Sequence, residues 1–281
     1  MCAAWFRVSS TKIVLAIVMN NLRQRQVDKE TIVIIIPTYN EGLVIQETIH
    51  QVMSIVGELR DYQVSILIFD SASTDDTQDK VRALQVIYHE RLFLQTELQK
   101  TGLGAAYLQA MQFAFHTLMA DIIVEFDADL SHQPKYLPLL FEALQENDVA
   151  IGSRYVRGGR IPRNWGVHRK FLSVLGNYVA RVILSFKYKD FTSGFRATRR
   201  HILIDVLPTH FLSNHYAYKL HLLWILHQNK AKICEVPIHF IDREKGVSKL
   251  PANSIMDSLR VIGTLRFAEM RRGIRRLLVG G

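Results

Sequence analysis

The stretch Ile122-Ile123-Val124-Glu125-Phe126-Asp127-Ala128-Asp129 predicts a buried strand that runs directly into two carboxylates. Its apolar, β-branched start suits a strand covered on both faces of a sheet. In extended backbone, residues two apart point the same way, so Asp127 and Asp129 would converge. Converging carboxylates are costly unless a cation or a shared proton lies between them. We therefore expect a Mg²⁺ or Mn²⁺ ion bound together with a nucleotide diphosphate, because these hard ions prefer oxygen ligands.

Predicted strands alternate with predicted helices along the chain, which indicates an α/β fold with a mostly parallel sheet. The strands are predicted at 31–36, 64–69, 86–88, from 122 onward, at 149–151 and at 233–241, and the helices at 43–59, 77–84, 105–119, 134–147, 171–185, in the region up to 227, and at 253–279. Ligands of such sheets bind at the carboxyl ends of strands. Asp70, the loop 37–41 and the Asp127/Asp129 pair all fall at such ends. Their convergence favours an active site over the alternative, a loop whose aspartates cap the next helix.

Length and composition fit an ordinary globular protein of 281 residues, with 48% hydrophobic and 22% charged residues. Because no Pro-rich or Ser-rich linker interrupts the chain, we expect one domain at 29–250, flanked by an N-terminal extension at 1–28 and a basic amphipathic helix at 251–281. The two cysteines, Cys2 and Cys234, are too few for a disulfide framework. A reducing compartment is the simplest inference.

The net charge of +9 favours anionic partners, which include phosphates, nucleic acid and anionic lipid. No helix-turn-helix, zinc-finger spacing or aromatic RNA-binding signature is present, so we expect no nucleic acid partner. No apolar run reaches the roughly 18 to 20 residues that span a bilayer. The helices at 171–185 and 253–279 mix apolar with basic residues and could lie on an anionic membrane, or else pack on the core with a solvated basic face.

Seven short motifs within residues 31–250 together resemble one family. They are Pro-Thr-Tyr-Asn-Glu at 37–41, the polar loop 70–77, Gly-Leu-Gly-x-x-Tyr at 102–107, Asp-Ala-Asp-Leu-Ser-His at 127–132, Gly-Ser-Arg-Tyr at 152–155, Thr-Ser-Gly-Phe-Arg at 192–196 and Ser-Lys-Leu at 248–250. The set is similar to the inverting nucleotide-sugar glycosyltransferases with a single Rossmann-like domain of the GT-A type, and within them to the dolichol-phosphate mannosyltransferases. The resemblance implies metal-dependent transfer of mannose from GDP-mannose to a polyprenyl (dolichyl) phosphate.

On the donor side, the resemblance assigns a role to each matching residue. The residues that would bind the nucleotide sugar are Pro37, Tyr39, Glu41, Asp70, Asp127, Asp129, Arg243 and Lys249, the last two on a loop that closes over the diphosphate. Asp127 and Asp129 would be the catalytic pair and, with Ser131, would hold the metal. Gly102 and Gly104 could cradle a phosphate at a helix start, but we interpret them as tight-turn glycines and expect Lys100 to make the phosphate contact.

On the acceptor side, the resemblance implies that Arg154, Arg169 and Ser173 hold the lipid phosphate. Arginine suits this task because its planar fork binds phosphate oxygens in pairs. A lipid acceptor implies contact with a membrane surface, directly or through a small membrane-anchoring subunit. We therefore expect a cytoplasmic protein that is peripheral on the cytosolic face of a membrane, the endoplasmic reticulum in a eukaryote or the inner membrane in a bacterium.

Two residues depart from the family pattern. Ser71 stands where a second acidic residue usually follows Asp70, and Glu97 stands where a basic residue usually precedes Lys100 by three positions. These departures leave two alternatives open. One is a UDP-glucose-dependent transferase acting on the same lipid, and the other is a catalytically silent homologue that serves as a scaffold.

Overall fold

The computed structural model describes residues 29–162, 165–242 and 253–279. The sheet in this part of the chain has seven strands in the order β3-β2-β1-β4-β6-β5-β7. The strands are β1 (Glu30–Thr38), β2 (Tyr62–Asp70), β3 (Leu92–Thr96), β4 (Ile122–Glu125), β5 (Val149–Ser153), β6 (Arg196–Arg199) and β7 (Ile233–Pro237). All neighbouring strands are parallel except β6, which runs antiparallel to β4 and β5. The predicted α/β fold with a mostly parallel sheet is confirmed.

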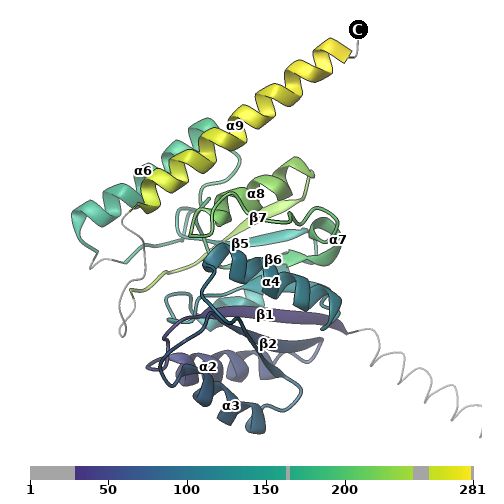
Figure 1. Ribbon diagram of the computed structural model, residues 1–281, viewed down its shortest axis with the longest axis vertical. Coiled ribbons are helices and arrows are strands. Elements are labelled where there is room, and N and C mark those ends of the chain that lie inside the picture. The colour runs from purple at the N-terminus through teal and green to yellow at the C-terminus, as the bar shows by residue number, and fades with distance from the viewer. Residues whose placement is uncertain (1–28, 163–164, 243–252, 280–281) are drawn as a thin grey trace, which may run out of the picture.

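Helices cover both faces of this sheet (Figure 1). They are α2 (Ile45–Gly57), α3 (Thr77–Ile87), α4 (Leu103–His116), η1 (Pro134–Tyr136), α5 (Leu137–Ala143), α6 (Val167–Ile183), α7 (Arg200–Leu203), α8 (Tyr218–Gln228) and α9 (Ser254–Val279). The β-branched run in β1 serves both faces because side chains alternate along a strand. Ile32, Ile34 and Ile36 pack with α2, α3 and α5, whereas Val33 and Ile35 pack with α4 and α8.

Two predicted elements were wrong. The expected third strand at 86–88 is instead the end of α3 and the residue after it, and the real third strand is β3. Val86 and Ile87 are 82% and 66% exposed, so their β-branched side chains do not mark a buried strand. The expected helical region up to 227 contains the central strand β6 and the short α7 before α8 begins. The sequence of β6, Arg-Ala-Thr-Arg, lacks the apolar run by which β1, β2 and β4 were recognised.

The long C-terminal helix α9 is part of the fold and packs along α6 and α8. Val261, Ile262 and Leu265 are buried in the same core cluster as α4 and α8. One side of α9 therefore packs into the core on the face of the sheet that α4 and α8 cover, as the core-packing alternative predicted. Within the described residues, no helix is long and apolar enough to cross a membrane.

Candidate active site

The loops that follow β1, β2 and β4 meet at one edge of the sheet. β1 and β2 run in parallel with Thr38 opposite Asp70 at their carboxyl ends, and β4 flanks β1 on its other side. These loops contain residues with positive φ at Asn40 (52°), Ala72 (56°) and Leu130 (58°). Such backbone is costly for residues other than glycine and persists only when the surroundings impose it. The surrounding structure therefore holds these loops in defined conformations at this edge.

Asp70 organises the first two loops. Its carboxylate accepts hydrogen bonds from Thr38 Oγ1 (2.8 Å), from the backbone N–H of Ser73 (2.9 Å), from Ser73 Oγ (2.5 Å) and from Gln78 Nε2 (2.7 Å). The side chain is fully buried. It thus fixes the geometry of loop 70–77 against β1, and its predicted contact with a nucleoside stays a prediction.

Tyr39 and Lys100 lie together at this edge although they come from different loops. The Lys100 ammonium stands 3.4 Å from the centre of the Tyr39 ring, an arrangement typical of a cation–π contact. Glu97 holds the Lys100 loop by accepting hydrogen bonds from Thr101 N (3.1 Å) and Thr101 Oγ1 (2.6 Å). Glu97, which departs from the family pattern, therefore has a structural role: it fixes the loop that carries Lys100.

Gly102 and Gly104, at the start of α4, allow close approach of a neighbouring loop. The backbone N–H of Gly104 donates to Asn214 O (3.0 Å), so it is already used. A Cβ at Gly102 or Gly104 would lie 2.5 Å or 2.4 Å from carbonyl oxygens of the loop at Asn214 and Ser213. The chain can approach this closely only without a side chain.

Two further predicted donor residues, Pro37 and Glu41, also lie at this edge. Pro37 is the penultimate residue of β1 and sits opposite Phe69. Glu41 follows in the next loop, where its backbone N–H donates to Thr77 Oγ1 (2.9 Å). Ser71 is buried and its backbone N–H donates to Thr38 O (2.9 Å), so the departure at this position is accommodated inside the loop. Arg243 and Lys249 lie outside the described residues.

The two predicted metal ligands stand just beyond β4. The Asp127 side chain is 25% exposed. Asp129 accepts hydrogen bonds from Ser131 N (3.1 Å) and Ser131 Oγ (2.6 Å), so Ser131 orients this carboxylate. Asp129 also borders a cavity of about 430 Å³ between α2 and the loop before η1. No cluster of three histidine, cysteine, aspartate or glutamate side chains suited to a metal occurs among the described residues. Two carboxylates and a hydroxyl fit an ion that completes its coordination with phosphate oxygens.

Asp127 faces two buried basic groups that the sequence analysis did not single out. His132 Nδ1 lies 3.4 Å and Lys219 Nζ 3.8 Å from Asp127 Oδ2. Burial, and then the nearby charge of Lys219, together lower the pKa of His132 to about 3, so this imidazole is neutral near pH 7. Its Nδ1 has no hydrogen-bond partner within the part of the chain that the structure describes. Lys219 is a charged residue within the otherwise largely apolar sequence of α8, and this position could have marked it as a candidate site residue.

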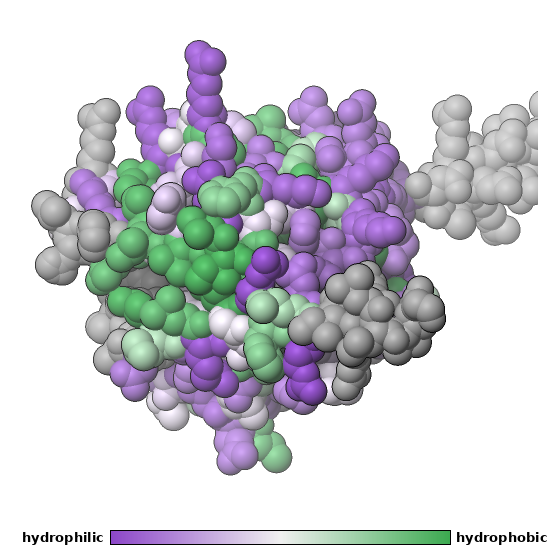
Figure 2. Space-filling view, turned by 90° about the horizontal axis from the view of Figure 1, so that it is seen from above, coloured by the Kyte–Doolittle hydropathy of each residue, from purple (hydrophilic) through white to green (hydrophobic). Residues whose placement is uncertain are grey.

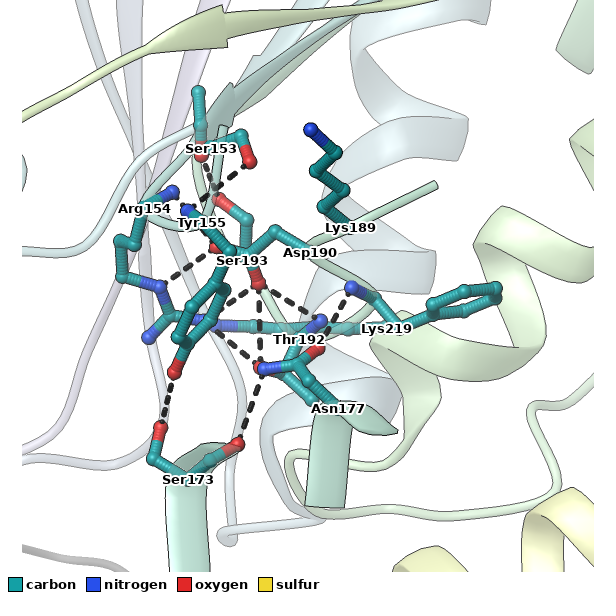
Figure 3. A network of polar contacts seen from close by, with 12 residues as sticks. Ser153, Arg154, Tyr155, Ser173, Asn177, Lys189, Asp190, Thr192, Ser193 and Lys219 are labelled. Atoms are coloured by element: carbon teal, nitrogen blue, oxygen red, sulfur yellow. Dashed lines mark hydrogen bonds and ion pairs between the residues drawn. The ribbon is translucent and has the colours of Figure 1, made fainter. Parts of the chain in front are cut away.

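Arg154, one of the predicted acceptor residues, is the centre of a polar network (Figure 3). Its Nε and Nη2 donate to the two oxygens of Asp190 at 2.7 Å each, and Nη2 also donates to Thr192 Oγ1 (2.8 Å). Burial alone would raise the pKa of Asp190, but the charge and hydrogen bonds of Arg154 lower it more strongly. The Arg154 side chain is only 9% exposed, so these partners fix the orientation of its guanidinium.

Ser173 joins the same network from α6. Its Oγ lies 2.7 Å from the hydroxyl of Tyr155, and one turn later Asn177 donates to Thr192 Oγ1 (3.2 Å). Two of the three predicted acceptor residues, Arg154 and Ser173, are therefore brought together. The third, Arg169, lies on α6, and its side chain is outside the described part of the structure.

Beneath the site, a buried ion pair explains the single charged residue of β4. Glu125 sits opposite Arg196 of β6, and the two form a bidentate pair at 2.5 Å and 3.0 Å. Tyr218 also donates to Glu125 (2.8 Å) and stacks on Tyr107. A buried charge persists only with such partners, so this network locks β4, β6 and α8 below the carboxylates.

The side of α6 that faces away from this network is apolar and exposed. Leu172, Val174, Leu175, Tyr178 and Val182 are 40–58% exposed. On α9, the exposed residues include Met256, Leu259, Phe267, Met270, Arg260, Arg266, Arg271 and Arg272. Figure 2 looks down on the end of the molecule that carries α6 and α9, and it shows hydrophobic surface bordered by hydrophilic side chains.

Comparison with known proteins identifies the family. Residues 33–207 match the model of glycosyl transferase family 2. The chain belongs to this family. This glycosyltransferase is 36% identical over 229 residues to a polyprenol monophosphomannose synthase of Mycolicibacterium smegmatis, which covers 80% of this chain and 83% of the relative. It is 33% identical to an undecaprenyl-phosphate mannosyltransferase of Micrococcus luteus, over 86% of this chain and 96% of the relative.

The fold of this glycosyltransferase also matches solved structures. The mannosyltransferase PcManGT from Pyrobaculum calidifontis, solved with GDP-Man and Mn²⁺, superposes with a TM-score of 0.53 at 16% identity, over 89% of this chain and 81% of that one. The likeness establishes the GT-A fold that the sequence resemblance implied.

Proposed function

We propose that this glycosyltransferase moves mannose from GDP-mannose to a polyprenyl phosphate and forms polyprenyl-phosphate mannose. The observation that carries the proposal is that Asp127 and Asp129 follow β4, that Arg154, paired with Asp190, follows β5 at the same edge of the sheet, and that the charge of Asp127 acts on Arg154. Relatives at 36% and 33% identity are named for mannosyl transfer to, or synthesis on, polyprenyl carriers, which supports the same acceptor class.

On the donor side, the proposed pocket is built from the loops after β1, β2 and β3. Tyr39 offers an aromatic face to the base, and Glu41 can accept ribose hydroxyl hydrogens. Lys100 stands over Tyr39, where its charge can meet a phosphate. We propose that Arg243 and Lys249 close over the diphosphate.

Asp127 and Asp129, with Ser131 orienting Asp129, would hold a Mg²⁺ or Mn²⁺ ion together with the diphosphate. When bound, such an ion stabilises the negative charge that develops on the leaving diphosphate. The protein's own contribution is to fix both carboxylates on rigid backbone at the end of β4. PcManGT, solved with GDP-Man and Mn²⁺, supports divalent metal use in this fold.

On the acceptor side, Arg154 and Ser173 would position the lipid phosphate, with Arg169 contributing from the same helix. An oxygen of this phosphate bonds to the anomeric carbon as the bond from that carbon to the diphosphate breaks, and GDP leaves. The acceptor phosphate is already ionised near neutral pH, so it needs positioning and charge balance more than a general base. The fixed pair of Arg154 with Asp190 holds the guanidinium in place for that task.

The exposed apolar side of α6 and the mixed apolar and basic surface of α9 would rest on the membrane that holds the acceptor. α6 carries Ser173 on its inner side and the apolar residues on its outer side, so the polyprenyl tail could leave the site along this helix. This placement supports peripheral association on an anionic surface.

The direct test is transfer of radiolabelled sugar to a short polyprenyl phosphate with Mg²⁺ or Mn²⁺ present. We expect label from GDP-mannose to enter the lipid phase and label from UDP-glucose to stay in the aqueous phase. Label from UDP-glucose alone would keep the mechanism and change the sugar. Absence of transfer from both donors, with membranes added, would favour the silent-homologue alternative.

A further inference from the structure

Lys219 is a buried lysine in the first turn of α8 that faces one of the proposed metal ligands. Its side chain is 5% exposed, and its Nζ lies 3.8 Å from Asp127 Oδ2. Burying an ammonium group costs free energy unless an opposite charge compensates it. Asp127 is the carboxylate that provides this compensation, so the two charges are coupled in the absence of any ligand.

The surrounding backbone makes room for this ammonium group. A Cβ placed on Gly194 would lie 2.1 Å from Lys219 Nζ and 3.2 Å from Asp127 Oδ2. The missing side chain at Gly194 therefore leaves the space in which the two charges meet. The Tyr216 ring, 5.4 Å from Nζ, adds a cation–π contact. Figure 3 shows Lys219 beside the Arg154–Asp190 network.

The charges around this point are nearly balanced before any ligand arrives. The negative charge of Asp127 is balanced by Lys219, and that of Asp190 by Arg154. Asp129 remains next to them with hydrogen bonds from Ser131. A divalent cation that enters alone therefore meets less net negative charge than two carboxylates would offer, and it is also repelled by Lys219.

We propose that Lys219 makes capture of the metal ion depend on the donor. The nucleotide diphosphate brings the negative charge and the oxygen ligands that the carboxylate pair lacks while Asp127 is paired with Lys219. Metal and donor then bind together, and the ion is not held at an empty site. This inference rests on the proposed function, since it assumes that Asp127 and Asp129 hold the ion.

The inference fixes the direction of two measurable effects. The wild-type protein should bind Mn²⁺ weakly on its own and much more tightly when GDP is present. In Lys219→Gln, which keeps most of the side-chain volume but removes the charge, Mn²⁺ alone should bind roughly tenfold more tightly. The factor by which GDP strengthens Mn²⁺ binding should fall correspondingly. Without the charge of Lys219, the negative charge of GDP is no longer needed to offset the repulsion of the cation.

The experiment is a titration of Mn²⁺ followed by the electron paramagnetic resonance signal of the free ion, with and without GDP. It compares the wild type with Lys219→Gln and with Lys232→Gln, which removes the same charge from an exposed position. Lys232→Gln should behave like the wild type. Circular dichroism establishes that each variant is folded.

Three results would overturn the inference. The first is wild-type binding of Mn²⁺ that is equally tight without GDP, a result that does not require any variant to fold. The second is unchanged Mn²⁺ binding in folded Lys219→Gln. The third is weaker GDP binding in that variant with unchanged binding of Mn²⁺ alone, which would make Lys219 a direct phosphate ligand. Mn²⁺ binding that fails even with GDP or UDP would instead contradict the metal-dependent function itself.

Discussion

Asp127 is the residue on which the proposed chemistry depends most. It lies at the end of β4, is partly exposed, and faces Lys219 and His132 from the protein side. In Asp127→Asn the side chain keeps its shape but loses its charge. We expect transfer to fall at least ~100-fold, because the charge that stabilises the departing diphosphate is no longer held in place.

Thermal unfolding and the lipid-phase transfer assay should be measured on the same preparation of Asp127→Asn. We expect a folded protein with a melting temperature within several degrees of the wild type. Asp61→Asn, an exposed carboxylate at the turn before β2, is the matched control and should keep full activity. Unaltered turnover in Asp127→Asn would remove Asp127 from the metal site.

Asp190 shows how a residue can be essential to the site without touching a ligand. It is buried, and it holds Arg154 through both of its oxygens. Because removing one partner leaves a buried charge alone, Asp190→Asn should lower the free energy of unfolding at pH 7 by about 3–5 kcal/mol. The exposed Asp205→Asn should cost less than about 0.5 kcal/mol. Urea denaturation of the three proteins measures both differences.

The same pair predicts a pH dependence with a definite sign. The pKa of Asp190 is lowered below its unfolded value of about 3.9, so its stabilising contribution is present above that pH. It is lost as the pH falls through the lowered folded pKa. The stability gap between wild type and Asp190→Asn should therefore narrow between pH 5 and pH 2–3, as followed by urea midpoints. A gap that stays constant over this range would show that the carboxylate charge is not its source.

At the scale of elements, the buried strands with continuous β-branched runs, such as β1 and β4, were predictable, whereas β3 and β6 were missed. The β-branched run of β1 and the apolar residues before Asp127 both predict strands. A strand in a sheet that is covered on both faces needs apolar side chains at every position, which gives a continuous apolar run. β6 was missed because it contributes only Ala197 to the apolar core, and its buried Arg196 is stabilised by a cross-strand ion pair with Glu125. The pattern of apolar residues along the chain cannot indicate that Arg196 pairs with Glu125, a residue 71 positions away.

The residues of the candidate site also divide into those that the sequence could place and those that it could not. Asp127, Asp129, Asp70 and Arg154 could be placed because each follows a recognisable strand or motif. Lys219 and Asp190 could not, since their importance comes from charges that the fold brings next to them. His132 lies within a motif, yet its neutral state depends on burial among Phe126, Phe195 and Phe240.

The helix α9 offers a pair of substitutions that separates packing from membrane contact. Ile262 is 2% exposed and belongs to the core, whereas Phe267 is 62% exposed. Ile262→Ala should lower the free energy of unfolding by about 2–4 kcal/mol. Phe267→Ala should change it by less than about 0.5 kcal/mol and should weaken binding to anionic vesicles.

Urea denaturation and vesicle flotation on both variants test this division. Ile262→Ala, once folded, should float like the wild type, because its side chain does not reach the surface. Flotation of Phe267→Ala at wild-type levels, together with wild-type stability, would place the membrane contact elsewhere on the molecule.

At the scale of the whole molecule, the net charge of +9 and the exposed arginines of α9 predict electrostatic attraction to anionic membranes. Each basic residue near such a surface contributes roughly 1 kcal/mol, and salt screens the attraction over a Debye length of about 10 Å at 0.1 M. We expect binding to phosphatidylglycerol vesicles to fall several-fold between about 0.05 M and 0.5 M KCl. Vesicles of phosphatidylcholine alone should bind little at either concentration.

Salt also separates the two contributions that α6 and α9 make to this surface. The charge contribution of the arginines is screened by KCl, whereas the apolar contribution of the exposed α6 residues is not. Binding that remains at 0.5 M KCl should therefore be lost in Leu175→Ser, on exposed α6, and retained in Arg271→Gln. At 0.05 M KCl, Arg271→Gln should show the larger loss of the two. The reverse order would contradict the assignment of the salt-resistant binding to α6 and of the salt-sensitive binding to the arginines of α9.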